Sequence, residues 1–341
     1  MESYGGIAIS YVEVPMRKRK FRFLLILCFM ICCILIIVNI KIQKSEEKLC
    51  GNQSIVFRLA ETGDPHHPSA MASGFFSSLV DERSNGRIKI KVYYNEDLGT
   101  PKEILEQVQF GGIAMARVNV LELTEVVNSL QYYFKPEAYK DSDALIDWIS
   151  ENSETISDSC QMECLYPLVW YYPDIRCFYS DETKLHKVSN FKNMKIKTTG
   201  CTIMTEVMQA LGGTAVETVT ADTYKSFSTG YLDAGETTLT EFMLSDFYRF
   251  MNYITLSHYI ACPDVMVVST DVFTMLAKPD RELLIECAKD TYEYQKELLK
   301  ESQDENITKL TNDKLLFFAD DKFDLDMKEN FIQDKAVIRH D

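Results

Sequence analysis

Short apolar segments alternate with helical patterns through most of the chain after residue 54. Residues 55–60 form a brief apolar run with strand character, and residues 87–93 alternate strictly between polar and apolar side chains. Strict alternation is typical of a strand with one face in water, because successive side chains point to opposite faces of a sheet. A glycine and two prolines within residues 63–68 interrupt the pattern before a helix that we expect over residues 69–81.

A capping pattern marks the start of the next helix. Thr100 is followed by Pro101 and then by Glu103, which predicts a capping box at the helix N-terminus. We expect this helix to end at Gly111-Gly112, and a further strand to begin at residue 113.

The same alternation returns in the second half of the chain. An extended crossing over residues 165–179 separates the two halves. Beyond it we expect helices over 201–211 and 222–228 and strands over 194–198, 215–216 and 231–236. Strands that alternate with helices predict βαβ units in a mostly parallel sheet, so we expect two α/β lobes.

A long helical pattern begins near Pro279 and continues beyond Leu299. Its apolar side chains recur at mixed spacings of three and four residues, as on one face of an α-helix. Such a helix is longer than one lobe requires, so we expect it to brace both lobes.

A basic cluster precedes an apolar segment near the N-terminus. Residues 17–22 carry five basic side chains, and residues 23–40 contain a single polar one, Asn39. The apolar run is close to the ~20 residues that a bilayer requires and longer than the apolar core of most signal peptides. The excess of Lys and Arg predicts a cytoplasmic head over residues 1–22, and a linker over residues 41–54 then leads to an extracytoplasmic body.

Two fates of the segment over residues 23–40 remain open. No small-residue cleavage site follows it, and its cysteines are not preceded by the small residues of a lipoprotein signal. These observations favour an uncleaved transmembrane anchor over a signal segment. We expect a protein at the extracytoplasmic face of the membrane, held there by the anchor or a lipid, or periplasmic if the segment is cleaved.

The charge of the chain argues against one class of partner. The 341 residues carry 36 Lys and Arg against 51 Asp and Glu, a net charge of −15. The residues after Cys50 hold 28 of the basic and 47 of the acidic side chains. Because nucleic-acid-binding proteins neutralise phosphates with positive side chains, nucleic acid is not an expected partner.

The cysteines do not form a framework of disulfides or metal ligands. Seven of them follow the apolar segment, an odd number scattered over a long chain. Cys160 and Cys164 have a loose metal-ligand spacing without a second Cys or His pair nearby, so two thiols or one local disulfide are expected rather than zinc. No Gly-x-Ser-x-Gly, His-Glu-x-x-His or glycine-rich phosphate loop occurs. We therefore expect no metal, no cofactor and no enzymatic activity.

Four segments, taken in order, resemble one family of binding proteins. They are residues 85–93 with 97–99 (NGRIKIKVY and DLG), residues 191–197 (FKNMKIK), residues 211–236 (with LGGTA and GYLDAGE), and residues 255–263. Together they are similar to the solute-binding proteins of TRAP (tripartite ATP-independent periplasmic) transporters, over nearly all of residues 55–315.

The resemblance implies an α/β fold with two lobes, like that of type II periplasmic binding proteins. Lobe 1 would comprise residues 55–173 and 263–301, and lobe 2 residues 174–262 and 302–341, with the long helix spanning both and the N-terminal anchor preceding them. It also implies a small organic acid, with a carboxylate, as the ligand in the cleft, and a TRAP membrane permease that receives it.

The resemblance also implies which residues contact the ligand. The arginine that holds the ligand's carboxylate in this family corresponds to Lys197, and an earlier arginine corresponds to Arg176. The asparagine that follows the glutamate at Glu236 in the family's pattern is Thr237 here. A lysine offers a point charge where an arginine offers a planar fork, so the two departures indicate a changed pocket.

Strand ends supply further candidates. In open α/β sheets ligands bind outside the carboxyl ends of strands, and Glu61, Arg117, Lys197 and Glu236 all follow predicted strands. Arg117 is a candidate to replace the charge changed at Lys197, although a structural role for it is also open. Cys201, at the start of a predicted helix, is expected near the cleft.

The expected function is a binding protein that delivers its solute to a permease. The first alternative is a ligand-sensing module that docks on a membrane receptor. The second is an extracytoplasmic thiol enzyme that uses Cys177 or Cys201, which the absence of catalytic motifs disfavours.

Single residues also have alternative interpretations. Arg176 could instead form a surface ion pair with Asp174 or Asp181, which would contribute little. His66 and His67 lie in a proline-rich loop that could line the cleft. Because no carboxylate or cysteine partner is evident, they are interpreted as exposed, ordinary loop residues.

Overall fold

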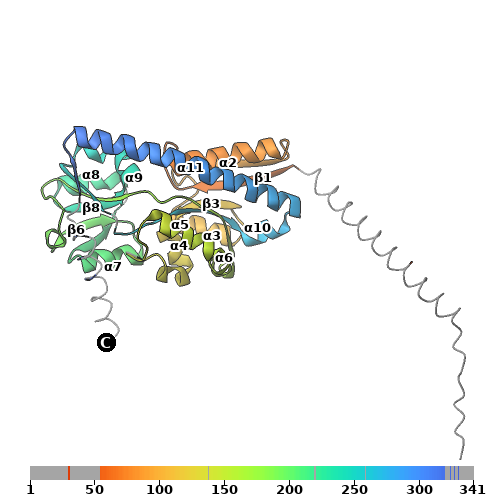
Figure 1. Ribbon diagram of the computed structural model, residues 1–341, viewed down its shortest axis with the longest axis horizontal. Coiled ribbons are helices and arrows are strands. Elements are labelled where there is room, and N and C mark those ends of the chain that lie inside the picture. Colours follow the sequence, from red (N-terminus) through yellow and green to blue (C-terminus); the bar gives the residue numbers. More distant parts are fainter. Residues whose placement is uncertain are drawn as a thin grey trace, which may run out of the picture. The chain divides into compact units, whose positions relative to one another are not determined.

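The computed structural model describes residues 54–136, 138–218, 220–257 and 259–318, together with Met30, Phe323, Asp326 and Glu329 (Figure 1). The chain divides into two compact units, and every element below belongs to the second unit, Ser54–Asp341. Apart from Met30 and Ser54, the expected head, membrane segment and linker lie outside the described residues. Within the described ranges, no helix has both the length and the apolar character needed to cross a membrane.

The first sheet has five strands in the order β2-β1-β3-β10-β4. Strand β1 pairs in parallel with β2 and β3, and β10 pairs antiparallel with β3 and β4. Helix α2 (Pro68–Arg83) connects β1 to β2, and α3 (Pro101–Gln109) connects β2 to β3. The strands are β1 (Ile55–Glu61), β2 (Ile88–Tyr93), β3 (Met115–Asn119), β4 (Leu165–Trp170) and β10 (Asp264–Ser269).

The second sheet has six strands in the order β11-β9-β5-β8-β6-β7. Strand β6 pairs in parallel with β7 and β8, β11 pairs in parallel with β9, and β5 pairs antiparallel with β8 and β9. The strands are β5 (Arg176–Ser180), β6 (Lys195–Thr198), β7 (Thr214–Glu217), β8 (Ala234–Thr238), β9 (Tyr253–Ser257) and β11 (Leu316–Phe318).

The expectation of mostly parallel sheets is wrong for β5 and β10, each of which lies between two antiparallel neighbours. Both strands follow a segment in which the chain crosses from one sheet to the other. A strand that arrives directly from the facing sheet enters at the edge where the parallel strands end, so it runs in the opposite direction. The parallel strands return through crossover helices instead.

Further helices cover the sheets. They are α4 (Val120–Val126), α5 (Ser142–Glu151), α6 (Ser153–Met162), α7 (Thr202–Ala210), α8 (Thr220–Ser228), α9 (Leu239–Leu244) and α10 (Thr270–Met275), with short 3₁₀ turns at Asn128–Tyr132, Val188–Phe191 and Phe247–Arg249.

The capping box expected at Thr100 is confirmed. The Thr100 N–H donates to Glu103 Oε2 at 2.9 Å, and the Glu103 N–H donates to Thr100 Oγ1 at 3.4 Å. These bonds satisfy backbone N–H groups that have no partner inside the helix, so α3 begins at Pro101.

The long helix α11 (Lys278–Asn312) extends over 35 residues and runs along both halves of the fold in Figure 1. It packs against β4 of the first sheet and β11 of the second. Leu284 packs in the core of the five-stranded sheet, and Leu310 packs in a core beside the six-stranded sheet. Between these points, Gln295 accepts from the Tyr172 N–H at 3.0 Å and Gln303 donates to Asp174 at 2.8 Å. The helix is thus bonded to the crossing segment between β4 and β5, where the two sheets join.

Candidate ligand-binding cleft

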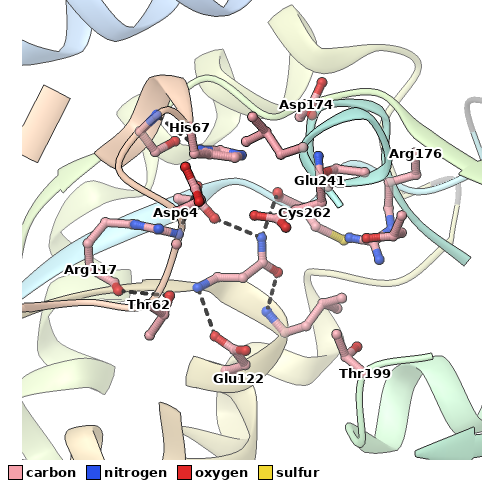
Figure 2. Close-up of a pocket in the computed structure, with 18 of the residues that line it drawn as sticks. Thr62, Asp64, His67, Arg117, Glu122, Asp174, Arg176, Thr199, Glu241 and Cys262 are labelled. Carbon is pink, nitrogen blue, oxygen red and sulfur yellow. Dashed lines mark hydrogen bonds and ion pairs between the residues drawn. The ribbon is translucent and has the colours of Figure 1, made fainter. Parts of the chain in front are cut away.

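A cleft of about 560 Å³ lies where the carboxyl ends of the parallel strands of both sheets meet (Figure 2). Its lining comes from the ends of β1, β2, β3, β6 and β8 and the segments after them, from the crossing segments that lead into β5 and β10, and from the middle of α11. The position agrees with the general rule that ligands of open α/β sheets bind outside the carboxyl ends of strands.

The wall from the five-stranded sheet is built around Arg117. This guanidinium forms an ion pair with Glu61 and a second one with Asp264 at 3.3 Å. Glu61 is fully buried and also accepts a hydrogen bond of 2.6 Å from Ser73 Oγ. Arg117 lines the cleft, but its charge is balanced by carboxylates on two sides, so it adds little net positive charge there.

Asp264 is held in its charged form. Burial acts to raise the pKa of its carboxyl, but Arg117, His67 and a hydrogen bond from Asn119 together hold this pKa below its ordinary value. His67 does not lie in an ordinary loop: it is buried, lines the cleft, and accepts from the Ser69 N–H through Nδ1 at 3.1 Å as the N-cap of α2. The interpretation of His67 as an exposed loop residue is therefore wrong, and the alternative that its loop lines the cleft is confirmed.

The wall from the six-stranded sheet holds a second buried ion pair. Arg176, at the start of β5, donates from Nε and Nη2 to both oxygens of Glu236, the second at 2.7 Å. Tyr259 donates from its hydroxyl to the same carboxylate at 2.7 Å. Burial acts to lower the pKa of Arg176, but the charge and hydrogen bonds of Glu236 hold it well above its ordinary value. The alternative of a surface pair with Asp174 or Asp181 is wrong.

Lys197 differs from the two arginines. It lies on β6, is partly buried and lines the cleft, and no carboxylate in the described part of the chain forms an ion pair with it. Burial lowers the pKa of its ammonium group, and the charges of Glu236 and Glu241 act against that shift. Thr237, on the neighbouring strand β8, lines the cleft beside it.

The structure thus brings four of the seven candidate residues to the cleft: Arg117, Arg176, Lys197 and Thr237. The other three, Glu61, Glu236 and Cys201, do not line it. The two glutamates lie behind the arginines that they hold, and Cys201 is buried, with Sγ 3.6 Å from Thr199 Oγ1. The six cysteines of the described ranges are free thiols, Cys160 and Cys164 among them, and no three His, Cys, Asp or Glu side chains there are placed to share a metal ion.

Sequence reasoning missed the acidic side chains of the lining. Glu122 and Glu241 each lie three residues after a helix N-cap, Asn119 and Thr238, at the first turn that follows a strand. A capping pattern directly after a strand was a signal for both positions, because the carboxyl ends of parallel strands face the cleft.

Burial raises the pKa of Glu122 to about 7. The charges of Asp264 and Glu96 act in the same direction, whereas the Asn119 N–H, which donates to Glu122 Oε2 at 3.1 Å, and Arg117 act against it. Because this carboxyl takes up a proton more readily in the folded chain than in the unfolded one, its contribution to stability is complete below pH 4.5 and is lost as the pH rises through about 7.

We expect Glu122→Gln to stabilise the protein at pH 8, by roughly 1–3 kcal/mol, and to change its stability little at pH 5. A glutamine can still accept the capping hydrogen bond, so the change tests the charge alone. Urea denaturation at both pH values measures the effect, with the exposed Glu106→Gln in α3 as the control. Equal effects of Glu122→Gln at the two pH values would show that the carboxyl titrates normally.

Comparisons with known proteins agree with this architecture. A family model for bacterial extracellular solute-binding proteins, family 7 (DctP), matches residues 59–322. A solute-binding protein of Chromohalobacter salexigens is 24% identical over 278 residues, which cover 81% of this chain and 83% of the relative.

Solved structures show the same fold. A TRAP periplasmic solute-binding protein of Chromohalobacter salexigens with bound D-glucuronate aligns with a TM-score of 0.76 at 23% identity, over 83% of this chain and 97% of the other. The sugar-acid-binding protein DctPAm of Advenella mimigardefordensis, in complex with galactonate, aligns with a TM-score of 0.77 at 16% identity, over 84% and 94% of the two chains.

Two α/β sheets that face each other across a cleft, with one long helix packed on both, define a solute-binding protein of the periplasmic-binding-protein type. The family model covers most of the described chain, and the protein belongs to family 7 of the bacterial extracellular solute-binding proteins, the solute-binding proteins of TRAP transporters. The resemblance found in the sequence is confirmed.

Proposed function

We propose that this protein captures a small carboxylate-bearing solute in the cleft and delivers it to a TRAP membrane permease. The observation that carries the proposal is Lys197, a cation in the lining without a carboxylate partner among the described residues. Burial removes water from this ammonium group and lowers its pKa. The negative charge of an anionic ligand would stabilise the charged ammonium in place of the lost water.

In this proposal lobe 1 comprises residues 55–173 and 263–301, and lobe 2 comprises residues 174–262 and 302–341. They would close by bending at the crossing segments and α11, and the ligand's contacts with both walls would favour the closed state. The hydrogen bonds of Gln295 with Tyr172 and of Gln303 with Asp174 support this role, because they tie α11 to a crossing segment.

The relatives support an organic acid as the ligand, since two of them bind glucuronate and galactonate. Arg176, fixed by both oxygens of Glu236, would present its remaining N–H donors to the solute. Lys197 would bind the carboxylate as a point charge, and Thr237 would add a hydroxyl. Glu61, Glu236 and Cys201 would support the site from behind.

The burial of the thiols supports binding without catalysis. Burial raises the pKa of Cys201, and burial together with nearby carboxylates raises that of Cys177 well above its ordinary value. A nucleophilic cysteine requires the opposite shift, because the thiolate is the reactive form.

The proposal for location follows from the sequence. Residues 1–22 would remain cytoplasmic, residues 23–40 would hold the protein to the membrane, and residues 41–54 would connect them to the extracytoplasmic lobes. If residues 23–40 are cleaved or replaced by a lipid, the lobes would still act outside the cytoplasm.

Two measurements test the function. Native mass spectrometry of protein purified from its source should show one small solute bound to each chain. Small-angle scattering should show a smaller radius of gyration when a binding acid from a panel of sugar acids and dicarboxylates is added. A protein that carries no solute, and that neither binds nor contracts with any acid of the panel, would contradict the proposal.

A further inference from the structure

Carboxylates outnumber cations in the lining of the cleft. The acidic side chains that line it are Asp64, Glu96, Glu122, Asp174, Glu241 and Asp264, and the cations are Arg117, Arg176 and Lys197. Both guanidinium groups are already paired with carboxylates. Within the described lining, Lys197 is therefore the cation that can pair with an acidic group of the ligand. More than one carboxylate of this lining forms no ion pair with a Lys or Arg of the described chain.

Glu96 approaches the cleft from the five-stranded sheet. It follows β2 in a turn where Asn95 and Glu96 both take left-handed backbone angles, with φ of 54° and 59°. The turn is held by the N–H groups of these two residues, which donate to the carbonyls of Gly63 and Glu61 at 3.1 and 3.4 Å. Such a conformation costs energy for residues other than glycine and persists only where the surroundings enforce it, so the fold fixes the backbone of this turn beside the cleft.

Glu241 approaches from the other sheet, in the first turn of α9 after β8 (Figure 2). Glu96 and Glu241 line the same cleft from opposite sheets. Burial, and then the negative charge of Glu241, raise the pKa of Glu96, as expected for two carboxyl groups that share one cavity. In the described part of the chain, no Lys, Arg or His forms an ion pair with either of them.

Closure increases the repulsion between these like charges. The walls move together and water leaves, and like charges interact more strongly in a drier site. Lys197 could neutralise the charge of only one carboxylate. Asp64 and Asp174 add further negative charge to the same lining. Hydroxyl groups of a solute can donate to carboxylate oxygens but leave their charge in place, whereas an ammonium group donates hydrogen bonds and also neutralises the charge.

We infer that the solute is a zwitterion, with a carboxylate that binds Lys197 and a protonated amine that binds between Glu96 and Glu241. The inference rests on the proposed function, since it concerns the same cleft, and it specifies the class of solute. The two glutamates are then the residues that select an amine-bearing acid over an acid with hydroxyl groups alone.

A matched pair of probes tests the inference. D-gluconate and 2-amino-2-deoxy-D-gluconate differ only in a hydroxyl or an ammonium group at one carbon. By calorimetry at pH 7 we expect 2-amino-2-deoxy-D-gluconate to bind at least tenfold more tightly than D-gluconate. Glu96→Gln and Glu241→Gln should each remove most of that preference, and Asp97→Asn, an exposed change in the same turn that does not line the cleft, should leave it intact.

Other outcomes separate the inference from the function. If D-gluconate binds as tightly as its amino analogue, and the two glutamine variants have unchanged affinities for both probes, the inference of a zwitterionic solute is wrong. The proposed function, a cleft that binds an acid, would then still stand. If neither probe binds, the repulsion between the two glutamates is tested without a ligand, in the double variant Glu96→Gln/Glu241→Gln. Loss of both charges should shift the protein toward the closed state, with a smaller radius of gyration in small-angle scattering, and an unchanged radius would contradict the inference.

Discussion

Replacement of Arg176 by methionine is expected to destabilise the folded protein by about 3–5 kcal/mol, the usual result of removing one partner of a buried ion pair. The change leaves the Glu236 carboxylate fully buried with the Tyr259 hydroxyl as its remaining donor among the contacts described above. A buried charge without a counter-charge must either be desolvated or take up a proton, and both cost free energy of folding. Urea denaturation at pH 7 measures the effect.

Two further variants identify its cause. In Arg176→Met/Glu236→Leu, where both charged partners are replaced by apolar side chains, most of the lost stability should return. Arg249→Met breaks an exposed ion pair of 3.2 Å with Asp246 and should cost less than 1 kcal/mol. A loss for Arg176→Met as small as that for Arg249→Met would mean that the Glu236 carboxylate is not isolated from water.

Replacement of Lys197 by methionine is expected to weaken the binding of D-gluconate by roughly 2–5 kcal/mol, because the ligand's carboxylate then enters the closed cleft without its counter-charge. Folding stability should not fall, since burial already lowers the pKa of this ammonium group and thus disfavours its charge in the folded state. Calorimetry and a thermal melt on the same preparations separate the two effects.

Lys195→Met is the matched control for this change. Lys195 lies two positions earlier on β6, is exposed, and does not line the cleft. Its replacement should leave affinity unchanged. Similar losses of affinity in the Lys195 and Lys197 variants would indicate a general effect of net charge, and would remove Lys197 from the site.

Local patterns in the sequence were enough for most of the secondary structure. The strand expected over residues 55–60 is β1 (Ile55–Glu61), and the helix expected to begin at Pro101 does so with its capping box in place. Period and capping involve residues within one or two turns of each other, so the amino-acid order alone determines them. The long helix α11 was found for the same reason.

The sequence also predicted Lys197 and Thr237 as residues of the ligand-binding site, because each lies in a short motif that resembles one family. Both line the cleft. A motif places a residue at the end of a strand, and strand ends of one sheet share one edge, so nearness to the cleft follows from local information. The ligand-binding roles of these residues remain proposals.

Only the tertiary structure decided which charges are paired. Arg176 and Glu236 are 60 residues apart in sequence, and Arg117 and Glu61 are 56 apart, so their pairing depends on which strands become neighbours. The direction of β5 and β10 depends on where the chain crosses between the sheets. Whether a carboxylate is buried behind an arginine, as Glu236 is, or lines the cleft, as Glu96 and Glu241 do, is set by long-range packing and burial, which no local pattern of residues encodes.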